Sequence, residues 1–496
     1  WGGPAMIANT GTGGVTMTSI GTSGALGIRL GYSSTIGCDL KLLAASGPIE
    51  VSTGSTAIEK QNSSSSITLG SKASTSVTSS SSDITVTTSN LDVDFNPVAN
   101  TTGTLTVKPT SGGTFASGAT TSGMSLAGLS ELVIGDAAAT SYSDITVVAT
   151  TLSGPMTIYG NNISERENHY DGDIRLLADG NISVSASVDF DATNDDIVLW
   201  ADNDANGAGN ISAGDNATFT SAGGNIYLAG GTDSDSDTYP DGFATSSSTH
   251  GVALGTSSAN VSALTSGGGD IVIKGKCTNT TTSQGHGLAQ RGLFDIDAGT
   301  GTVTIEGESS SWYGIDFSNL LSSSTPWVVS SSATSGTAIS IIGTTTAASN
   351  YGVVFNFPIN KQLIADGGGS IVVNGVGTAG QYGIFAQNVD FLASGGSIIL
   401  DGGVEGIRMT DYGARFGSLA GSAVTSSTAN ISLAGDEIRV DVWRSGFSTK
   451  MTTSGTINFK HPLDQLTALL GQREQQQVDG MLVHLQDQAQ YSLGKQ

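Results

Sequence analysis

Positive charge is scarce in this chain of 496 residues, in which 19 lysines and arginines stand against 43 aspartates and glutamates. The formal net charge of −24 opposes binding to nucleic acids and to anionic membrane surfaces, because their phosphates require basic partners. The same acidity favours solubility and contact with cations. We therefore expect no nucleic-acid partner.

Cysteine is nearly absent as well. The two cysteines, Cys38 and Cys277, are too few for a disulfide framework, and we expect both to be ordinary strand or turn residues. The five histidines show no metal-ligand spacing. No run of about 18 apolar residues is present, so the sequence offers no transmembrane helix. The chain opens with Trp1, which predicts a processed product or an internal piece.

Helix-forming residues such as Glu, Lys and Leu are too scarce for a helical fold, whereas glycine is abundant, with 69 residues. A short phrase recurs in which a small or acidic turn leads into an alternating β-run that ends at glycine. One strand with one turn cannot bury its apolar face alone, but many stacked copies can. The repeat therefore predicts an all-β chain folded as a parallel β-helix. Its copies lie at residues 223–230, 268–275, 301–307, 368–375 and 395–402.

A second phrase joins the first in the second half of the chain. It begins with Tyr-Gly at Tyr313, Tyr351 and Tyr382, and it returns as Gly-Ile-Arg-Met at Gly406. The two phrases suggest two walls of one coil, with glycine at the corner, where a positive φ is needed. Between residues 171 and 230 the strands lie about a dozen residues apart, which predicts several strands per coil. The expected core is a stack that includes Ile84, Ile174, Ile197, Ile226, Ile271, Ile305, Ile371 and Ile398.

Composition divides the chain into three parts. Residues 1–165 carry short Ser/Thr-rich coils, residues 166–460 carry longer two-strand repeats, and residues 461–496 form a Gln-rich tail. Apolar residues of the tail fall at helical spacing amid Gln, Asp and Glu, which predicts a short helical cap or tail after the last coil. These residues are Leu463, Leu466, Leu469, Leu470, Val478, Met481, Leu482 and Leu485.

The sharpest local motif is Asp-Asn-Asp-Ala-Asn-Gly, which begins at Asp202 and matches the first half of an oxygen-ligand calcium loop. Ala213 stands at the twelfth position, where such a loop carries glutamate. The same residue types are the usual vocabulary of turns, so both a Ca²⁺ site and a simple turn remain open. The oxygen ligands on offer are Asp202, Asp204, Asn206 and Asp215.

A second acidic segment follows the first and carries aspartates at alternate positions. These carboxylates would crowd negative charge unless a cation or solvent relieves it, so a second Ca²⁺ site and a solvated loop are the alternatives. Neither segment has the basic surroundings of a phosphate or nucleic-acid site. The residues concerned are Asp233, Asp235, Asp237 and Asp241.

Evidence for catalysis is weak. Many β-helical polysaccharide lyases and hydrolases use clustered Asp or Glu on one wall, and only Asp195 with Asp196, and the acids near His169, suggest such a cluster. Adjacent residues of a strand point to opposite faces, so at most one member of the pair faces outward. Acids at strand starts are more often turn caps. We therefore expect no catalytic residues and no enzymatic activity.

The most distinctive phrase runs Asp-Ile-Val-Leu-Trp-Ala-Asp-Asn-Asp-Ala-Asn-Gly-Ala-Gly-Asn-Ile from Asp196 to Ile211, followed by Gly-Gly-Asn-Ile-Tyr-Leu-Ala-Gly-Gly at residues 223–231. It resembles the repeat regions of very large secreted bacterial proteins of the filamentous haemagglutinin type. The resemblance covers much of the span from Gly154 to Gly435. It implies a right-handed parallel β-helix and a surface-exposed or released rod used in adhesion, aggregation or a cell-surface fibre.

Together these features predict a non-enzymatic extracellular structural protein, either a surface adhesin or a filament subunit, built from a β-helical rod. Its expected partners are copies of itself, because open coil ends are unpaired sheet edges, and cell-surface or glycan ligands. The alternative is a β-helical protein that binds or degrades polysaccharide through an acidic and aromatic cleft on one wall. A third reading is an assembly that depends on calcium at the two acidic segments.

Overall fold

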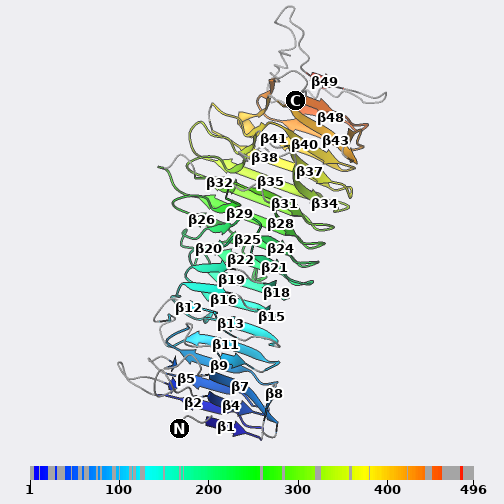
Figure 1. Ribbon diagram of the computed structural model, residues 1–496. Coiled ribbons are helices and arrows are strands. Elements are labelled where there is room, and N and C mark those ends of the chain that lie inside the picture. Colours follow the sequence, from blue (N-terminus) through cyan, green and yellow to red (C-terminus); the bar gives the residue numbers. More distant parts are fainter. Residues whose placement is uncertain are drawn as a thin grey trace, which may run out of the picture. The chain divides into compact units, whose positions relative to one another are not determined.

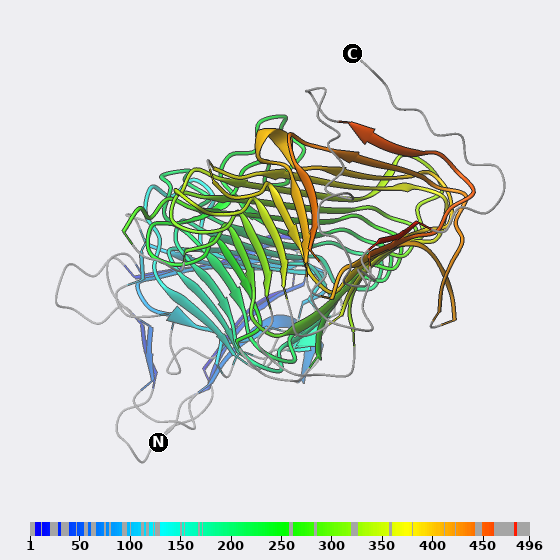
Figure 2. The same cartoon turned by 90° about the horizontal axis from the view of Figure 1, so that it is seen from above.

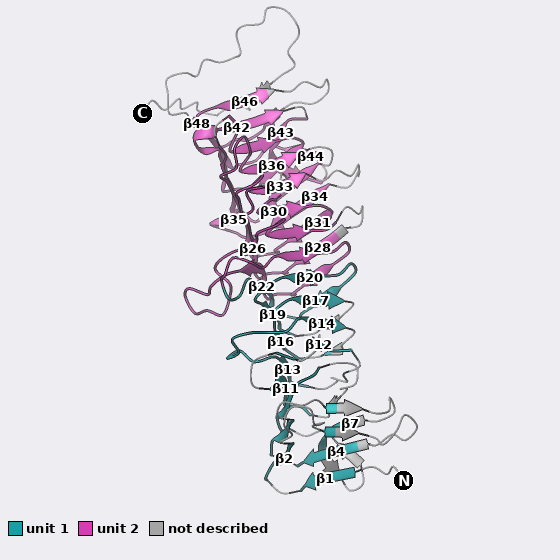
Figure 3. Cartoon of the chain, turned by 90° about the vertical axis from the view of Figure 1, so that its left-hand side faces the viewer, with its two compact units in different colours: residues 1–204 teal, residues 205–496 magenta. Residues whose placement is uncertain are grey.

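The computed structural model describes most of the chain as strands and tight turns, in two compact units, residues 1–204 and 205–496 (Figure 3). The described residues are 5–10, 12–19, 28–30, 39–45, 47–53, 58–60, 66–73, 76–78, 81–91, 97–99, 101–110, 114–115, 119–122, 124, 129–148, 151–152, 154–166, 169–170, 172–256, 261–281, 285–318, 326–356, 360–378, 380–410, 412–421, 423–441, 449–460 and 481–483.

Unit 2 is a stack of coils, and each complete coil contributes one strand to each of three walls. Figure 1 shows β29, β32, β35 and β38 as successive rungs of one wall, and from above the strands of unit 2 surround a common interior (Figure 2). Wall 1 contains β25 (Ile226–Gly230), β29 (Ile271–Cys277), β32 (Val303–Ser309), β35 (Thr337–Thr345), β38 (Ser370–Val376), β41 (Ser397–Asp401), β45 (Asn430–Ala434) and β48 (Ile457–Lys460), all parallel.

The other two walls of unit 2 are also parallel sheets. Wall 2 contains β23 (Ile211–Ala213), β27 (Val252–Leu254), β30 (Leu288–Gln290), β33 (Ile315–Ser318), β36 (Val353–Asn356), β39 (Ile384–Ala386), β42 (Ile407–Thr410) and β46 (Ile438–Asp441). Wall 3 contains β24 (Thr218–Thr220), β28 (Val261–Thr265), β31 (Leu293–Asp297), β34 (Trp327–Ser331), β37 (Lys361–Ala365), β40 (Val389–Ala393), β43 (Ala414–Ala420), β47 (Thr449–Met451) and β49 (Met481–Val483).

Unit 1 is built on the same plan. Its longest wall contains β2 (Val15–Thr18), β5 (Ile49–Ser52), β9 (Ile84–Thr88), β11 (Thr104–Pro109), β13 (Glu131–Ile134), β16 (Met156–Gly160), β19 (Ile174–Ala178) and β22 (Ile197–Ala201). A second sheet contains β12 (Ala119–Thr120), β14 (Ile145–Val148), β17 (Ile163–Arg166) and β20 (Ile182–Val184), and a third contains β1 (Ala5–Asn9), β4 (Asp39–Ala44), β7 (Ser66–Ala73) and β10 (Pro97–Ala99).

Short elements complete the two units. In unit 1 they are β3 (Ile28–Leu30), β6 (Ile58–Lys60), β8 (Ser76–Thr78), β15 (Thr151–Leu152), β18 (His169–Tyr170) and β21 (Asp189–Asp191). In unit 2 they are β26 (Ala244–Ser246), β44 (Ala423–Thr425) and the 3-10 turn η1 (Gly403–Glu405). The pairs β7–β8 and β43–β44 are antiparallel hairpins. Among the described residues, no helix is long and apolar enough to cross a bilayer.

Alternating sequence explains both the strands and the core. In β29 and β32 every second residue is buried, and register pairs Ile271 with Val303 and Ile273 with Ile305 on the inner face. Each fully buried aliphatic side chain contributes about 1.5–3 kcal/mol to folding. All eight isoleucines expected in the core are fully buried. The predicted all-β parallel β-helix is thus confirmed.

Aromatic side chains fill a second inner column of unit 2. Phe317 lies 5.2 Å from Phe355, centroid to centroid, and Phe391 lies 5.7 Å from Phe355 and 5.1 Å from Phe416. All four rings are buried. These residues belong to walls 2 and 3, and wall 3 is the wall that the two repeated phrases did not predict. The sequence did not predict the strands of wall 3, because they share no common phrase. Two examples are Leu-Phe-Asp-Ile-Asp in β31 and Lys-Gln-Leu-Ile-Ala in β37.

Glycine columns line the corner between walls 1 and 2. A Cβ atom on Gly343 would lie only 2.3 Å from the carbonyl oxygen of Gly352, and neither residue has a positive φ. The expectation of a positive φ at this corner is therefore wrong, because close approach of two backbones is what excludes a side chain. Positive φ occurs instead in turns that lead into wall 1, at Gly267 (68°) and Gly396 (62°).

The structure describes only a small part of the predicted helical tail. Most of residues 461–496 lie outside the described residues, but Met481 and Leu482 belong to β49, which pairs in parallel with β47. The helical prediction is wrong for these two residues, because backbone pairing with a neighbouring rung decides their conformation. Cys277 is a buried residue of β29, as expected, while Cys38 is not among the described residues. The compositional boundaries after residues 165 and 460 stay predictions.

Candidate functional site

The second acidic segment is an insertion within one rung of wall 1. β25 pairs with Ile271–Ile273 of β29, and β26 pairs with Gly275–Cys277 of the same strand. The chain between β25 and β26 therefore leaves the wall and returns to continue the same rung, and the bridge between Gly230 and Gly242 closes its base. We call residues 231–241 the acidic loop.

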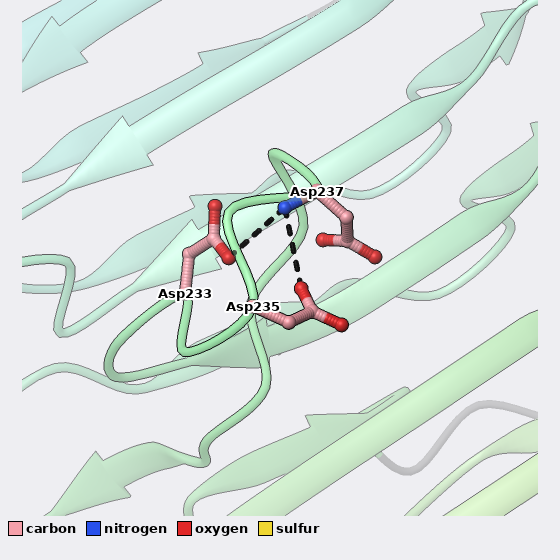
Figure 4. Close-up of side chains that lie close together, drawn as sticks. All are labelled: Asp233, Asp235 and Asp237. Carbon is pink, nitrogen blue, oxygen red and sulfur yellow. Dashed lines mark hydrogen bonds between the residues drawn. The ribbon is translucent and has the colours of Figure 1, made fainter.

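Three carboxylates converge in the acidic loop. One oxygen from each of Asp233, Asp235 and Asp237 lies within 4.8 Å of the other two. The Asp237 N–H donates to Asp233 at 3.3 Å and to Asp235 at 3.2 Å (Figure 4). Asp241 lies outside this group and accepts hydrogen bonds from the Ser234 N–H at 2.7 Å and from its hydroxyl. Calcium binding by the loop stays a prediction.

The loop is anchored to wall 1 at two points. The Tyr239 ring stacks on Tyr227 of β25, with centroids 4.5 Å apart, and the Lys274 ammonium group donates to the backbone carbonyl of Asp241 at 3.1 Å. Hydrogen bonds from Ser234 lower the pKa of Asp241. These two contacts hold the acidic loop against the surface of wall 1.

The half calcium motif has residues in both units, Asp202 and Asp204 in unit 1 and Asn206 and Asp215 in unit 2. In unit 1, Asp202 is buried, and burial first and then the charges of Asp204 and Asp202 raise the pKa of Asp179. In unit 2, the Asp215 carboxylate accepts hydrogen bonds from the Thr256 N–H at 2.9 Å and from its hydroxyl at 2.5 Å. Asp215 thus bonds to Thr256, a residue 41 positions later in the chain. Calcium binding by this motif also stays a prediction.

The Asp195–Asp196 pair stands at a strand start beside Asp173 and Arg175. The Asp196 N–H donates to Asp173 at 3.1 Å, and Arg175 lies 3.0 Å from Asp173 and 3.8 Å from Asp196. Burial, followed by repulsion from Asp173 and Asp196, raises the pKa of Asp195. These contacts are those of turn caps and surface ion pairs, and the expectation of no catalytic residues stays a prediction.

An aromatic column runs along the outside of wall 2 at the position that precedes each corner glycine. Successive ring centroids are 5.1 Å apart for His250 and His286, 5.4 Å for His286 and Tyr313, and 5.5 Å for Tyr313 and Tyr351. On the next rung Phe385, which stands two residues after the corner glycine Gly383, contacts the column 5.0 Å from Tyr351. The Tyr-Gly phrase at Tyr313 and Tyr351 is thus the signature of this outer column.

Buried titratable groups lie beside this column. His286 Nε2 is 3.4 Å from the Asp316 carboxylate, and both side chains are at most 5% exposed. Burial raises the pKa of Asp316, and burial lowers the pKa of Lys361 to about 7 although Asp316 attracts its proton. Burial, together with the positive charge of Arg291, lowers the pKa of His250 to about 4. These shifted pKa values predict that the stability of unit 2 depends on pH.

A surface patch, here called the Tyr-Arg patch, begins at the last tyrosine of the aromatic column and extends over the following rungs. It comprises Tyr351, Tyr382, Phe385, Arg408 and Arg439. The Arg408 guanidinium carbon lies 6.0 Å from the Tyr382 ring centroid and 5.9 Å from that of Phe385, and Arg408 stands opposite Arg439 in register. Burial raises the pKa values of Tyr351 and Tyr382.

Sequence reasoning missed the Tyr-Arg patch. The phrase Gly-Ile-Arg-Met at Gly406 was visible, but Arg439 stands in Glu-Ile-Arg-Val, which differs at its first and last residues. Aligning the two on their shared Ile-Arg would have placed both arginines in one outward column. The buried pair of His286 and Asp316 gave no signal, because its members belong to different coils.

No family model matches the chain, and no curated protein or solved structure is significantly similar to it. The resemblance to filamentous haemagglutinin-type proteins stays a prediction.

Proposed function

We propose that this chain is a non-enzymatic extracellular structural protein of the adhesin type, in which a β-helical scaffold presents surface loops and wall faces to its partners. The observation that carries the proposal is the placement of the acidic loop. The wall continues in register on both sides of this insertion, from Leu228 paired with Ile273 to Ala244 paired with Gly275. A repeat scaffold that admits insertions without losing its ladder is suited to display binding elements.

Self-association is the second part of the proposal, and β1 of unit 1 supports it. Ile7 is in register with Leu42, yet Ile7 is 47% exposed whereas Leu42 is fully buried. Met6, on the opposite face, is 42% exposed. Within the described part of the chain β1 pairs only with β4, and we infer that its other edge, with the side chain of Ile7, receives a further strand. A second copy of the chain is the occupant we propose.

Localisation is tested with an antibody raised against the folded protein. Intact producing cells, or their culture medium, should react with the antibody, and external protease should remove the label from the cells. Label that appears only after permeabilisation would refute the extracellular assignment.

Self-association is tested by sedimentation velocity and electron microscopy at high and low protein concentration. The wild-type chain should form concentration-dependent assemblies, and Ile7→Lys should shift the equilibrium toward monomer without lowering the melting temperature. Thr85→Lys, at an outward position of β9 in the same unit, is the matched control and should assemble normally. Monomers at all concentrations would contradict self-association.

A further inference from the structure

The Tyr-Arg patch presents one kind of chemistry on consecutive rungs of wall 2. Phe385 pairs in register with Arg408, and Arg408 pairs with Arg439, so the three side chains form one outward column spaced at about 4.8 Å per rung. Tyr382 lies beside this column, and its hydroxyl donates to Glu437 at 3.1 Å. Along this column a ligand would contact the aromatic ring of Phe385 on one rung and the guanidinium groups of Arg408 and Arg439 on the next two rungs.

Both arginines are held in place by aromatic neighbours. Arg408 packs over two rings within about 6 Å, a cation–π geometry that fixes the guanidinium plane. A hydrogen bond between Arg439 and the Tyr382 hydroxyl lowers the pKa of that tyrosine against the larger effect of burial. Tyr382 therefore lies at the centre of the patch, beside Arg408 and bonded to Glu437 and Arg439.

The chemistry of the patch matches a sugar chain. A pyranose ring offers C–H faces that pack on aromatic side chains and hydroxyl groups that both donate and accept hydrogen bonds. Arginine supplies up to five donors in a fixed fork, and the Glu437 carboxylate supplies acceptors. A polymer with regularly repeated units suits a surface whose residues also repeat at a regular spacing.

Charge decides between sugar classes. The net charge of −24 repels polyanions, and Glu437 offsets part of the positive charge of the two arginines. Nucleic acids and uronate-rich chains are therefore disfavoured, whereas uncharged hydroxyl groups carry no such penalty.

We propose that the Tyr-Arg patch binds a neutral polysaccharide, with sugar rings against Phe385 and Tyr382 and sugar hydroxyls bonded to Arg408 and Arg439. This inference rests on the proposed adhesin function and names the ligand class of one of its surfaces. No bond of the glycan is broken, because the patch is a binding surface.

Affinity electrophoresis tests the proposal. The full chain is run in native gels that contain soluble dextran, mannan or xylan, which are neutral, or polygalacturonate, which is anionic. At least one neutral polysaccharide should retard the protein, and Tyr382→Ala and Arg439→Ala should each weaken this binding at least tenfold. Arg439 is exposed, so its replacement should leave the melting temperature unchanged and separates lost binding from lost folding.

Matched controls come from unit 1. Tyr159→Ala and Arg175→Ala remove a partly buried tyrosine and a surface arginine from the other unit, and both should bind like the wild type. Absence of retardation by all three neutral polysaccharides, retardation by polygalacturonate alone, or equal retardation of wild type and patch variants would each overturn the proposal. Surface labelling of producing cells is independent of these gels, so the proposed function can stand when the glycan inference fails.

Discussion

Arg415 and Asp390 form a two-point ion pair on the outside of wall 3, with Nε to Oδ1 and Nη2 to Oδ2 both at 2.6 Å. Asp390 also accepts hydrogen bonds from the amides of Asn360 at 3.0 Å and Gln362 at 3.1 Å. Its side chain is 1% exposed, whereas that of Arg415 is 44% exposed. Four donor nitrogens, two from Arg415 of β43, one from Gln362 of β37 and one from Asn360 just before β37, therefore converge on one buried carboxylate.

Loss of Arg415 should weaken unit 2 measurably. Arg415→Ala removes two charge-assisted bonds from a buried carboxylate, and we expect the free energy of unfolding to fall by about 1.5–3 kcal/mol. Lys276→Ala is the control, because its pair with Glu308 joins side chains about 40% exposed and should contribute less than about 1 kcal/mol. Urea unfolding of both variants is the measurement, and equal losses would show that burial of Asp390 is unimportant.

Corner glycines should not tolerate even one methyl group. Gly343→Ala would place Cβ at 2.3 Å from the Gly352 carbonyl oxygen, so neighbouring rungs must shift, and we expect a loss of about 1–3 kcal/mol or more. Gly395→Ala meets its nearest neighbour at 3.4 Å, has no positive φ, and should change stability by less than about 1 kcal/mol. Thermal unfolding compares the two, and a stable Gly343→Ala would refute the close-approach explanation.

Lys361 should make stability rise in alkaline solution. Its pKa is lowered from 10.5 to about 7, so between these values the unfolded chain binds a proton that the folded chain does not. Stability then increases with pH, by about 1.4 kcal/mol per pH unit at its steepest. Lys361→Met should remove this slope. Unfolding free energies of both proteins from pH 7 to 10 provide the measurement, and parallel curves would contradict it.

Acid should destabilise the histidine pair. The pKa of His250 is lowered from 6.5 to about 4, and that of His286 is lowered further by burial, by His250 and by Arg291. Below pH 6.5 the unfolded chain therefore binds more protons, and stability falls as pH decreases toward 4. His250→Phe keeps an aromatic ring beside His286 and should make this loss less steep. The measurement is the melting temperature of both proteins between pH 7 and 4. If the melting temperature of the variant falls as steeply with acid as that of the wild type, protonation of His250 is not the cause.

Calcium should act on the acidic loop if its three carboxylates form a cation site. The wild-type melting temperature should then rise when CaCl₂ replaces chelator, and Asp235→Asn should lack this rise because one ligand loses its charge. Asp401→Asn, at an exposed position of wall 1, is the control and should respond like the wild type. Identical wild-type curves with and without calcium would leave the loop as a solvated, hydrogen-bonded turn.

Local alternation was enough to identify the strands and much of the core. Ile271, Ile305 and Ile371 could be assigned to the interior because side chains of a strand point alternately to its two faces and only one face of a stacked coil is buried. The three clustered aspartates of the acidic loop were also visible, since they are near neighbours in sequence. Such features depend on interactions among residues a few positions apart.

Contacts between coils could not be read in the same way. Asp390 meets Arg415, His286 meets Asp316, and Arg408 stands opposite Arg439 only because coils of unequal length bring these residues into register. The third wall depends on the same stacking, since its strands carry no shared phrase. Alternation decides which face of a strand is buried, whereas the lengths of the turns and loops decide which side chains from different coils meet.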